Sequence, residues 1–323
     1  MPVRFTTPGL GGQNSGDIAA HEWRVGAAYR RLTADNWFVG REQRMDAAPF
    51  GKPLSLDINS LDLTVRHGLT SKVSWELTLP FSHGVQTRFY ADGQRHRVSA
   101  RGLGDVNLVG TAWLSDPAAN PSRNLAIGVG IKVPTGNNMA TDDFFTATGT
   151  TRALVDQSIQ LGDGGFGVIL QTQAFTRFTR NLFGYLSGSY LVSPKRKTDV
   201  QLVKADGTGS GIFLSVPDVY SARAGAGYAL WPAHDLLTSL GARVDGIPLR
   251  DVIGGGDDGF RRPGYSVYAD PAISFAAARG TVTLSIPVRI GLDFQPDLTK
   301  GHPTGGDLAA YLVFVSFSRR CCG

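Results

Sequence analysis

The chain has 323 residues, of which 18% are charged and 41 are glycine, and 32 Lys and Arg stand against 27 Asp and Glu. This small basic excess is dispersed and forms no basic, aromatic-laced patch, so nucleic-acid binding is not expected. No apolar run reaches the length of about 18 residues that a transmembrane helix needs. The only cysteines, Cys321 and Cys322, are adjacent and cannot build a disulfide framework.

Residues 1–20 are rich in Gly, Pro and Thr and are predicted to form a flexible N-terminal arm. The arm lacks the apolar core of a signal peptide. We therefore expect the signal of an exported protein to have been removed from this chain.

Alternation of apolar with polar or small residues then predicts a series of β-strands. Each is roughly ten residues long, the length that a tilted membrane strand needs. In chain order the predicted strands are 23–32, 60–67, 73–81, 105–114, 124–136, 165–178, 182–192, 219–230, 236–245, 265–275, 281–293 and 308–317.

The predicted strand at 124–136, NLAIGVGIKVPTG, indicates the environment of the face opposite its apolar one. Its apolar positions, from Leu125 to Val133, alternate with Ala126, Gly128, Gly130 and Lys132. A strand of a soluble sandwich would carry long polar side chains at these alternate positions. Small residues and one lysine predict instead that this face lines the interior of a barrel.

The connections between predicted strands alternate strictly between long polar segments and short turns, which is typical of outer-membrane barrels. We therefore predict an all-β fold, a transmembrane up-and-down antiparallel β-barrel of about 12 strands over residues 21–318. Its short turns would be periplasmic, its long loops extracellular, and residues 319–323 a C-terminal tail. A soluble barrel or sandwich is the alternative. It is less favoured because the Val-, Leu- and Ile-rich faces would then need a second covering sheet.

The face opposite the aliphatic one carries charged and amide side chains that we expect to line the lumen. These are Arg24, Arg30, Arg66, Glu76, Lys132, Gln171, Gln173, Arg177, Arg223, Arg243, Asp270, Arg289 and Asp293, with Asp62 and Asp245 as further acids. They could line a translocation path or form an internal salt-bridge network, and both interpretations stay open. About twelve strands enclose a narrow lumen. The middle of the long loop 137–164, TRALVDQSIQ, is apolar enough to fold inward as a constriction.

Three segments resemble a known family. GLGDVNLVGTAWL (102–114), NLAIGVGIKVPTG (124–136) and VDQSIQLGDGGFGVIL (155–170) are similar to the outer-membrane barrels named for the MetA pathway of phenol degradation. The resemblance covers residues 102–192 and is only architectural elsewhere. It implies an outer-membrane channel for small aromatic or other apolar compounds, and it transfers no binding residue.

The sequence therefore predicts a passive diffusion channel of a Gram-negative outer membrane, with size and charge filtering by lumen side chains. Its expected partners are outer-membrane lipid and lipopolysaccharide, small-molecule solutes, and a protein partner in a membrane complex. The alternative is a closed barrel that anchors or scaffolds such a complex. No G-x-S-x-G, phosphate-loop or H-E-x-x-H motif occurs, so neither an enzyme nor a cofactor or metal is expected.

Overall fold

The computed structural model describes residues 18–47, 54–204, 206–232, 235–253, 259–277, 280–296 and 305–322. Within these residues no helix has the length and hydropathy required to cross a membrane. Residues 1–17 of the predicted arm lie outside the described part of the chain.

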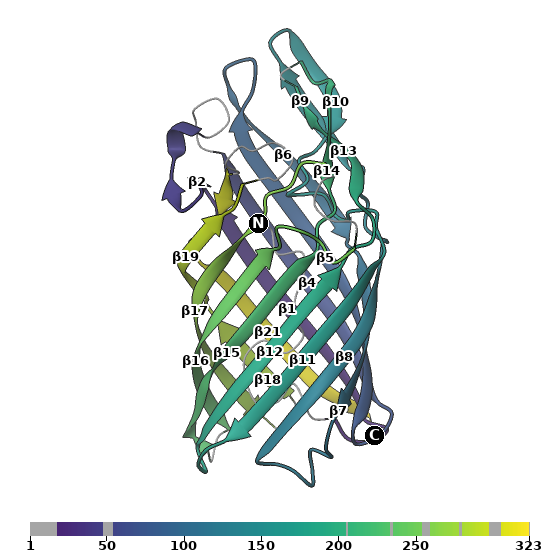
Figure 1. The fold of residues 1–323 in the computed structure, drawn as a ribbon, viewed down its shortest axis with the longest axis vertical. Coiled ribbons are helices and arrows are strands. Elements are labelled where there is room, and N and C mark those ends of the chain that lie inside the picture. The colour runs from purple at the N-terminus through teal and green to yellow at the C-terminus, as the bar shows by residue number, and fades with distance from the viewer. Residues whose placement is uncertain are drawn as a thin grey trace.

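Antiparallel strands close into a barrel, shown in Figure 1. They are β1 (Trp23–Ala34), β4 (Ser55–Gly68), β5 (Val73–Phe89), β6 (Arg95–Leu103), β7 (Val106–Trp113), β8 (Arg123–Val133), β11 (Gly167–Arg177), β12 (Leu182–Val192), β15 (Val219–Trp231), β16 (Leu236–Ile247), β17 (Gly264–Ala277), β18 (Gly280–Ser285), β19 (Val288–Phe294) and β21 (Leu312–Cys322). β6 with β7, and β18 with β19, are the halves of two interrupted strands, so the barrel has 12 strands. Pairing of β21 with β1 closes it. The predicted fold is confirmed.

Shorter elements extend the barrel at the end that carries the long connections, opposite the C-terminus (Figure 1). β2 (Asn36–Val39), β3 (Glu42–Gln43) and β20 (Gly305–Leu308) form a small sheet beside the 3-10 helix η1 (Met45–Ala47). β9 (Thr141–Thr146) pairs with β10 (Gly149–Leu154), and β13 (Lys197–Val203) pairs with β14 (Gly209–Ser215). The sequence predicted loops at these positions, apart from Leu308, which was predicted to begin the last strand.

The two faces of the strands differ as predicted. In β8, Ile127 and Val129 are 52% and 57% exposed, whereas Ala126 and Lys132 are 0% and 5% exposed. Successive residues of a strand point to opposite faces, so the exposed aliphatic residues point away from the lumen. We call this outward apolar surface the apolar belt; it includes Val25, Tyr29, Leu61, Leu63, Phe81, Leu108, Ile127, Val129, Ile131, Val168, Leu170, Leu186, Leu240, Ile273, Val282, Ile290 and Val315. Such a belt is the feature by which a barrel contacts hydrocarbon.

The last strand is longer than expected. β21 continues to Cys322, and Arg319 and Arg320 pair in register with Val25 and Arg24 of β1. Residues 319–322 are therefore part of the closing strand, not a tail.

Candidate functional site: a vestibule above a buried charge cluster

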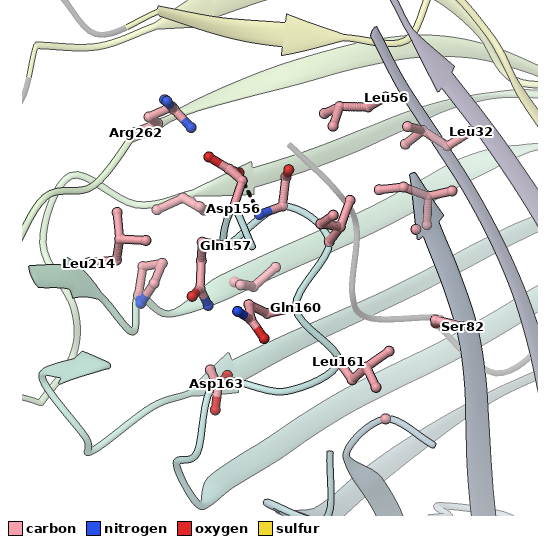
Figure 2. Close-up of a pocket in the computed structure, with 18 of the residues that line it drawn as sticks. Leu32, Leu56, Ser82, Asp156, Gln157, Gln160, Leu161, Asp163, Leu214 and Arg262 are labelled. Atoms are coloured by element: carbon pink, nitrogen blue, oxygen red, sulfur yellow. Dashed lines mark hydrogen bonds between the residues drawn. The ribbon is translucent and has the colours of Figure 1, made fainter. Parts of the chain in front are cut away.

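A cavity of about 240 Å³ lies inside the barrel at the end with the long connections; we call it the vestibule (Figure 2). Most of the exposed surface of its walls is apolar, but nine charged and four amide side chains of the described residues also line it. The apolar lining includes Leu32, Leu54, Leu56, Ile58, Ile159, Leu161, Leu191, Leu214, Val216, Phe260 and Phe294. Predominantly apolar walls with a few placed polar groups are typical of small-molecule sites.

One wall of the vestibule is formed by residues 156–163 of the loop 137–164, which we call the inward loop, whereas residues 141–154 form the β9–β10 hairpin. Val155 and Ile159 of this loop are 4% and 3% exposed, and Ile159 packs directly on β5. A Cβ atom added to Gly84 of β5 would lie only 2.8 Å from the Cβ atom of Ile159. The glycine therefore allows the close approach. The predicted inward fold of residues 151–160 is confirmed from Asp156 onward, whereas residues 151–154 belong to β10.

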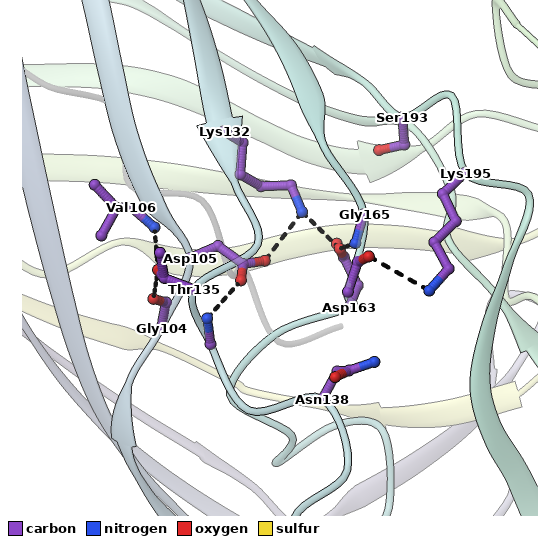
Figure 3. Close-up of polar contacts among 12 residues, drawn as sticks. Gly104, Asp105, Val106, Lys132, Thr135, Asn138, Asp163, Gly165, Ser193 and Lys195 are labelled. Atoms are coloured by element: carbon purple, nitrogen blue, oxygen red, sulfur yellow. Dashed lines mark hydrogen bonds and ion pairs between the residues drawn. The ribbon is translucent and has the colours of Figure 1, made fainter.

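The inward loop is joined to the barrel wall through the Lys132 cluster, which consists of Lys132, Asp105 and Asp163 (Figure 3). Lys132 Nζ lies 3.0 Å from Asp105 Oδ2 and 2.6 Å from Asp163 Oδ1. Asp105 Oδ1 also accepts a hydrogen bond of 3.0 Å from the N–H of Gly136. Lys132 lies on the inner face as expected. Its ammonium group is engaged by two carboxylates rather than free in the lumen.

The Lys132 cluster sits at the interruption between β6 and β7. On β5, Thr78 and Phe81 pair with Asn107 and Leu103, so residues 104–106 oppose only residues 79–80 and the second strand contains a one-residue bulge. The N–H of Gly104 donates to the Pro80 carbonyl at 2.7 Å within this bulge. The bulge directs the Asp105 carboxylate towards Lys132.

The three segments that carry the family resemblance meet at this point. Asp105 comes from the first segment, Lys132 and Gly136 from the second, and Asp163 from the third. A Cβ atom on Gly162 would lie 2.6 Å from Asp105 Oδ1, so the close approach of the loop requires glycine there. The three segments that resemble the family therefore form the junction between the barrel wall and the inward loop.

A group of buried charged side chains lies at the floor of the vestibule, where Arg30, Asp62 and Asp245 line the cavity. We call it the buried charge cluster; its members are Arg30, Asp62, Arg223, Arg243, Asp245 and Asp270. Arg223 Nε donates to Asp270 Oδ2 at 2.6 Å, and Ser285 Oγ donates to Asp270 Oδ1 at 2.6 Å. Arg243 Nε donates to Asp245 Oδ2 at 2.8 Å. Arg223 and Asp270 are 2% and 0% exposed, so these charges fill the lumen rather than line an open aqueous space.

The remaining predicted lumen residues are dispersed. Towards the short-turn end, Arg24 pairs with Glu22 at 2.8 Å, and Arg66 Nη2 donates to Ser74 Oγ at 3.0 Å. Asp293 pairs with Arg41 at 3.0 Å at the other end. The others lie on several strands, where Gln171 is buried, Glu76, Gln173 and Arg289 are half-buried, and Arg177 is exposed at the end of β11. Arg289 Nη1 donates to the carbonyls of Leu308 and Ala309.

Two further residues line the vestibule, Asp156 and Arg262, and neither was expected from the sequence (Figure 2). The Arg262 guanidinium lies 5.8 Å from the ring centre of Trp37 and 5.2 Å from that of Phe260. Burial raises the pKa of Asp156, but the charge of Arg262 and the hydrogen bond from the Ser158 N–H outweigh burial, so the pKa lies below its ordinary value. Asp156 is therefore held as a carboxylate.

No metal cluster accompanies these groups. In the described part of the chain, no three His, Cys, Asp or Glu side chains are grouped so that they could hold a metal ion. The site consists of apolar walls, ion pairs and hydrogen-bonding groups.

The fold is similar to that of solved outer-membrane barrels. The COG4313 outer membrane channel from Pseudomonas putida F1 matches with a TM-score of 0.66 and 15% identity, over 96% of this chain and 99% of that chain. The transport unit of the autotransporter AIDA-I from Escherichia coli matches at 0.49 and 9%, over 97% and 93% of the chains. The CymD monoaromatic hydrocarbon channel matches at 0.48 and 9%, over 95% and 90%.

The likeness to the Pseudomonas putida channel shows the architecture of an outer-membrane barrel. The two weaker likenesses add nothing to that conclusion. No protein-family model matches the chain, and no curated protein matches it.

Proposed function

We propose that this protein is a passive outer-membrane channel for small apolar molecules, aromatic ones among them. The observation that carries the proposal is the vestibule, a cavity of about 240 Å³ whose exposed walls are mostly apolar, inside a barrel that has an outward apolar belt. An apolar solute gains free energy when it leaves water for such walls, about 25 cal/mol for each Å² of apolar surface that is buried.

The buried charge cluster supports the same choice of solute. Arg223 and Asp270 are paired and almost fully buried, so they leave no ring of free charge to conduct hydrated ions. Of the predicted lumen residues, we assign Arg30, Arg223, Arg243 and Asp270 to the barrier beneath the vestibule. The others would line the lumen above and below it.

The fold supports the proposed setting and partners. The apolar belt fits outer-membrane lipid, and the long connections would face the cell exterior, where lipopolysaccharide forms the outer leaflet. The likeness to a channel barrel and the resemblance to the MetA-pathway family both support a transport role. A protein partner in a membrane complex remains a further proposal.

A closed barrel that serves as an anchor or scaffold is the second candidate. The observation that favours it is the interior itself, where Arg223, Arg243, Asp245 and Asp270 form paired, buried charges. Such pairs can rigidify a barrel without conducting anything. A scaffold would take up no solute, so solute uptake separates the two candidates.

The test is uptake of radiolabelled toluene by Gram-negative cells that produce the protein. Ser82 faces the vestibule, so Ser82→Trp should fill the cavity and reduce the added uptake several-fold. Leu61→Trp is the matched control, because Leu61 lies on the outward belt and is 40% exposed. Equal uptake by both variants would contradict a route through the vestibule, and no added uptake by the wild type would favour the scaffold.

A further inference from the structure

The outer face of β6 carries three exposed arginines beyond the apolar belt. Arg95, Arg97 and Arg101 are exposed, and they alternate with Val98 and Ala100, which are 4% and 7% exposed on the inner face. We call the three the β6 arginines. Residues at alternate positions of a strand share one face, so their guanidinium groups follow one line on the outside of the barrel.

The register places this line directly above the belt. Leu103 of β6 pairs with Phe81, an outward belt residue that is 41% exposed. The next outward position along β6 is Arg101, which pairs with His83 of β5. From Arg101 to Arg95 the strand rises by about 20 Å before its tilt is considered. The line thus starts at the edge of the hydrocarbon zone and extends away from it.

The β6 arginines differ from three other arginines of this end of the barrel. Arg31, Arg41 and Arg152 form ion pairs with Asp57, Asp293 and Asp143 at 3.2, 3.0 and 3.3 Å. Within the described residues, by contrast, Arg95, Arg97 and Arg101 have no ion pair and no side-chain hydrogen bond.

The carboxylate that contacts the β6 backbone at Ser99 is already engaged. Asp142 Oδ2 accepts a hydrogen bond of 2.7 Å from the Ser99 N–H, and its other oxygen lies 3.5 Å from Arg152. It therefore leaves the guanidinium groups of the β6 arginines available to an external anion.

We propose that the β6 arginines bind the phosphate groups of the outer-leaflet glycolipid, lipopolysaccharide. Guanidinium groups bind phosphate through paired, charge-assisted hydrogen bonds. A phosphorylated lipid headgroup meets the barrel where the belt ends, which is the position of Arg101. Phosphates farther out in the glycolipid core would reach Arg97 and Arg95. The inference rests on the outer-membrane setting proposed above, but not on the identity of the solute.

The experiment compares binding of fluorescently labelled lipopolysaccharide by the purified, detergent-solubilised barrel and two triple variants. The test variant is Arg95→Gln, Arg97→Gln, Arg101→Gln. The control variant, Arg123→Gln, Arg180→Gln, Arg319→Gln, removes the same charge from exposed arginines at the short-turn end. Heat-modified migration in gels confirms that all three proteins are folded.

The test variant should bind about tenfold or more weakly than the wild type, and the control variant should bind normally. Dephosphorylated lipopolysaccharide should bind the wild type about tenfold more weakly than intact lipopolysaccharide does. Equal binding by the test variant and the wild type would overturn the proposal, as would undiminished binding of the dephosphorylated lipid. If vesicles of anionic phospholipid bound as tightly as lipopolysaccharide, the β6 arginines would be a contact for anionic lipids in general. That result would also overturn the proposal.

Measuring toluene uptake by the same variants tests the proposed function independently of lipopolysaccharide binding. The β6 arginines lie outside the vestibule, so the test variant should take up toluene at the wild-type rate. If the wild type bound lipopolysaccharide but took up no toluene, the proposed solute would be wrong, whereas the proposed lipopolysaccharide site would still hold.

Discussion

Lys132 Nζ lies 2.6 Å from Asp163 Oδ1, and this ion pair joins the barrel wall at β8 to the inner end of the loop 137–164. Both side chains are largely buried, and Asp105 completes the cluster at 3.0 Å. The position of one vestibule wall therefore depends on the charge of Lys132. From the sequence alone, this charge was expected to filter solutes.

Removing Lys132 should release the inward loop. In Lys132→Gln, the carboxylates of Asp105 and Asp163 remain close together without a cation, and loss of one partner of a buried pair costs about 3–5 kcal/mol. Hydrogen exchange at the loop amides of Ile159 and Leu161 should accelerate on the order of 100-fold. Arg152→Gln is the control, since it breaks an exposed pair on the same loop. Unchanged exchange in Lys132→Gln would show that the cluster does not hold the loop.

The packing of Ile159 on Gly84 should be intolerant of a methyl group. In Gly84→Ala the new Cβ atom would lie 2.8 Å from Ile159 Cβ, so the loop must shift. We expect toluene uptake to change several-fold while the barrel remains folded. In Gly110→Ala the nearest atom is the Val129 carbonyl oxygen at 3.7 Å, an ordinary contact, so that variant should behave as the wild type. Identical uptake by both variants would contradict the assigned role of the loop.

The Arg223–Asp270 pair should show strong coupling in a double-mutant cycle. Asp270→Leu leaves the buried Arg223 guanidinium without this carboxylate and should lower the free energy of unfolding by about 3–5 kcal/mol. The double variant Arg223→Met, Asp270→Leu removes both charges and should recover most of that loss. Urea unfolding of the barrel in lipid vesicles gives the energies. Additive losses in the cycle would mean that the two side chains are not an energetic pair.

The exposed pair of Arg31 and Asp57 serves as a comparison. Its atoms lie 3.2 Å apart, but its side chains are 55% and 34% exposed. Exposed ion pairs contribute about 0–1 kcal/mol, so Asp57→Asn should have little effect on unfolding.

The position of the inward loop should depend on pH through Asp156. The pKa of Asp156 is lowered in the folded protein, with Arg262 as the main favourable charge. The carboxylate thus contributes stability above its unfolded pKa of about 3.9, and this contribution is lost as the pH falls through the lower folded pKa. A variant that keeps Trp37 as its only tryptophan should change fluorescence in this acidic window, because Arg262 lies over that ring. The change should be absent when Asp156→Asn is added, and its persistence would assign the titration to another group.

The sequence predicted the barrel well because strand alternation and connection length are local properties. Ile127, Val129 and Lys132 alternate so plainly that their faces could be assigned without a structure. The end of the last strand was predicted too early, since the register of Arg319 and Arg320 with β1 is a long-range property.

The site could be predicted only in part. Arg223, Arg243 and Asp270 were expected on the inner face, but which charges form pairs depends on how the strands pair and on which side chains meet across the lumen. Asp105 and Asp163 were missed because they lie outside the alternating strands. Their setting among Gly104, Gly162 and Gly164 was the available signal, since glycines permit the close approach of a loop.

The uptake of toluene, compared with that of the similarly small sugar xylose, tests the central claim most directly. Cells that produce the protein in an otherwise tight outer membrane should take up toluene several-fold faster, while xylose uptake stays at the level of the host. Equal acceleration of both solutes would reveal an open aqueous pore and contradict the apolar route. No acceleration of either would contradict a channel altogether.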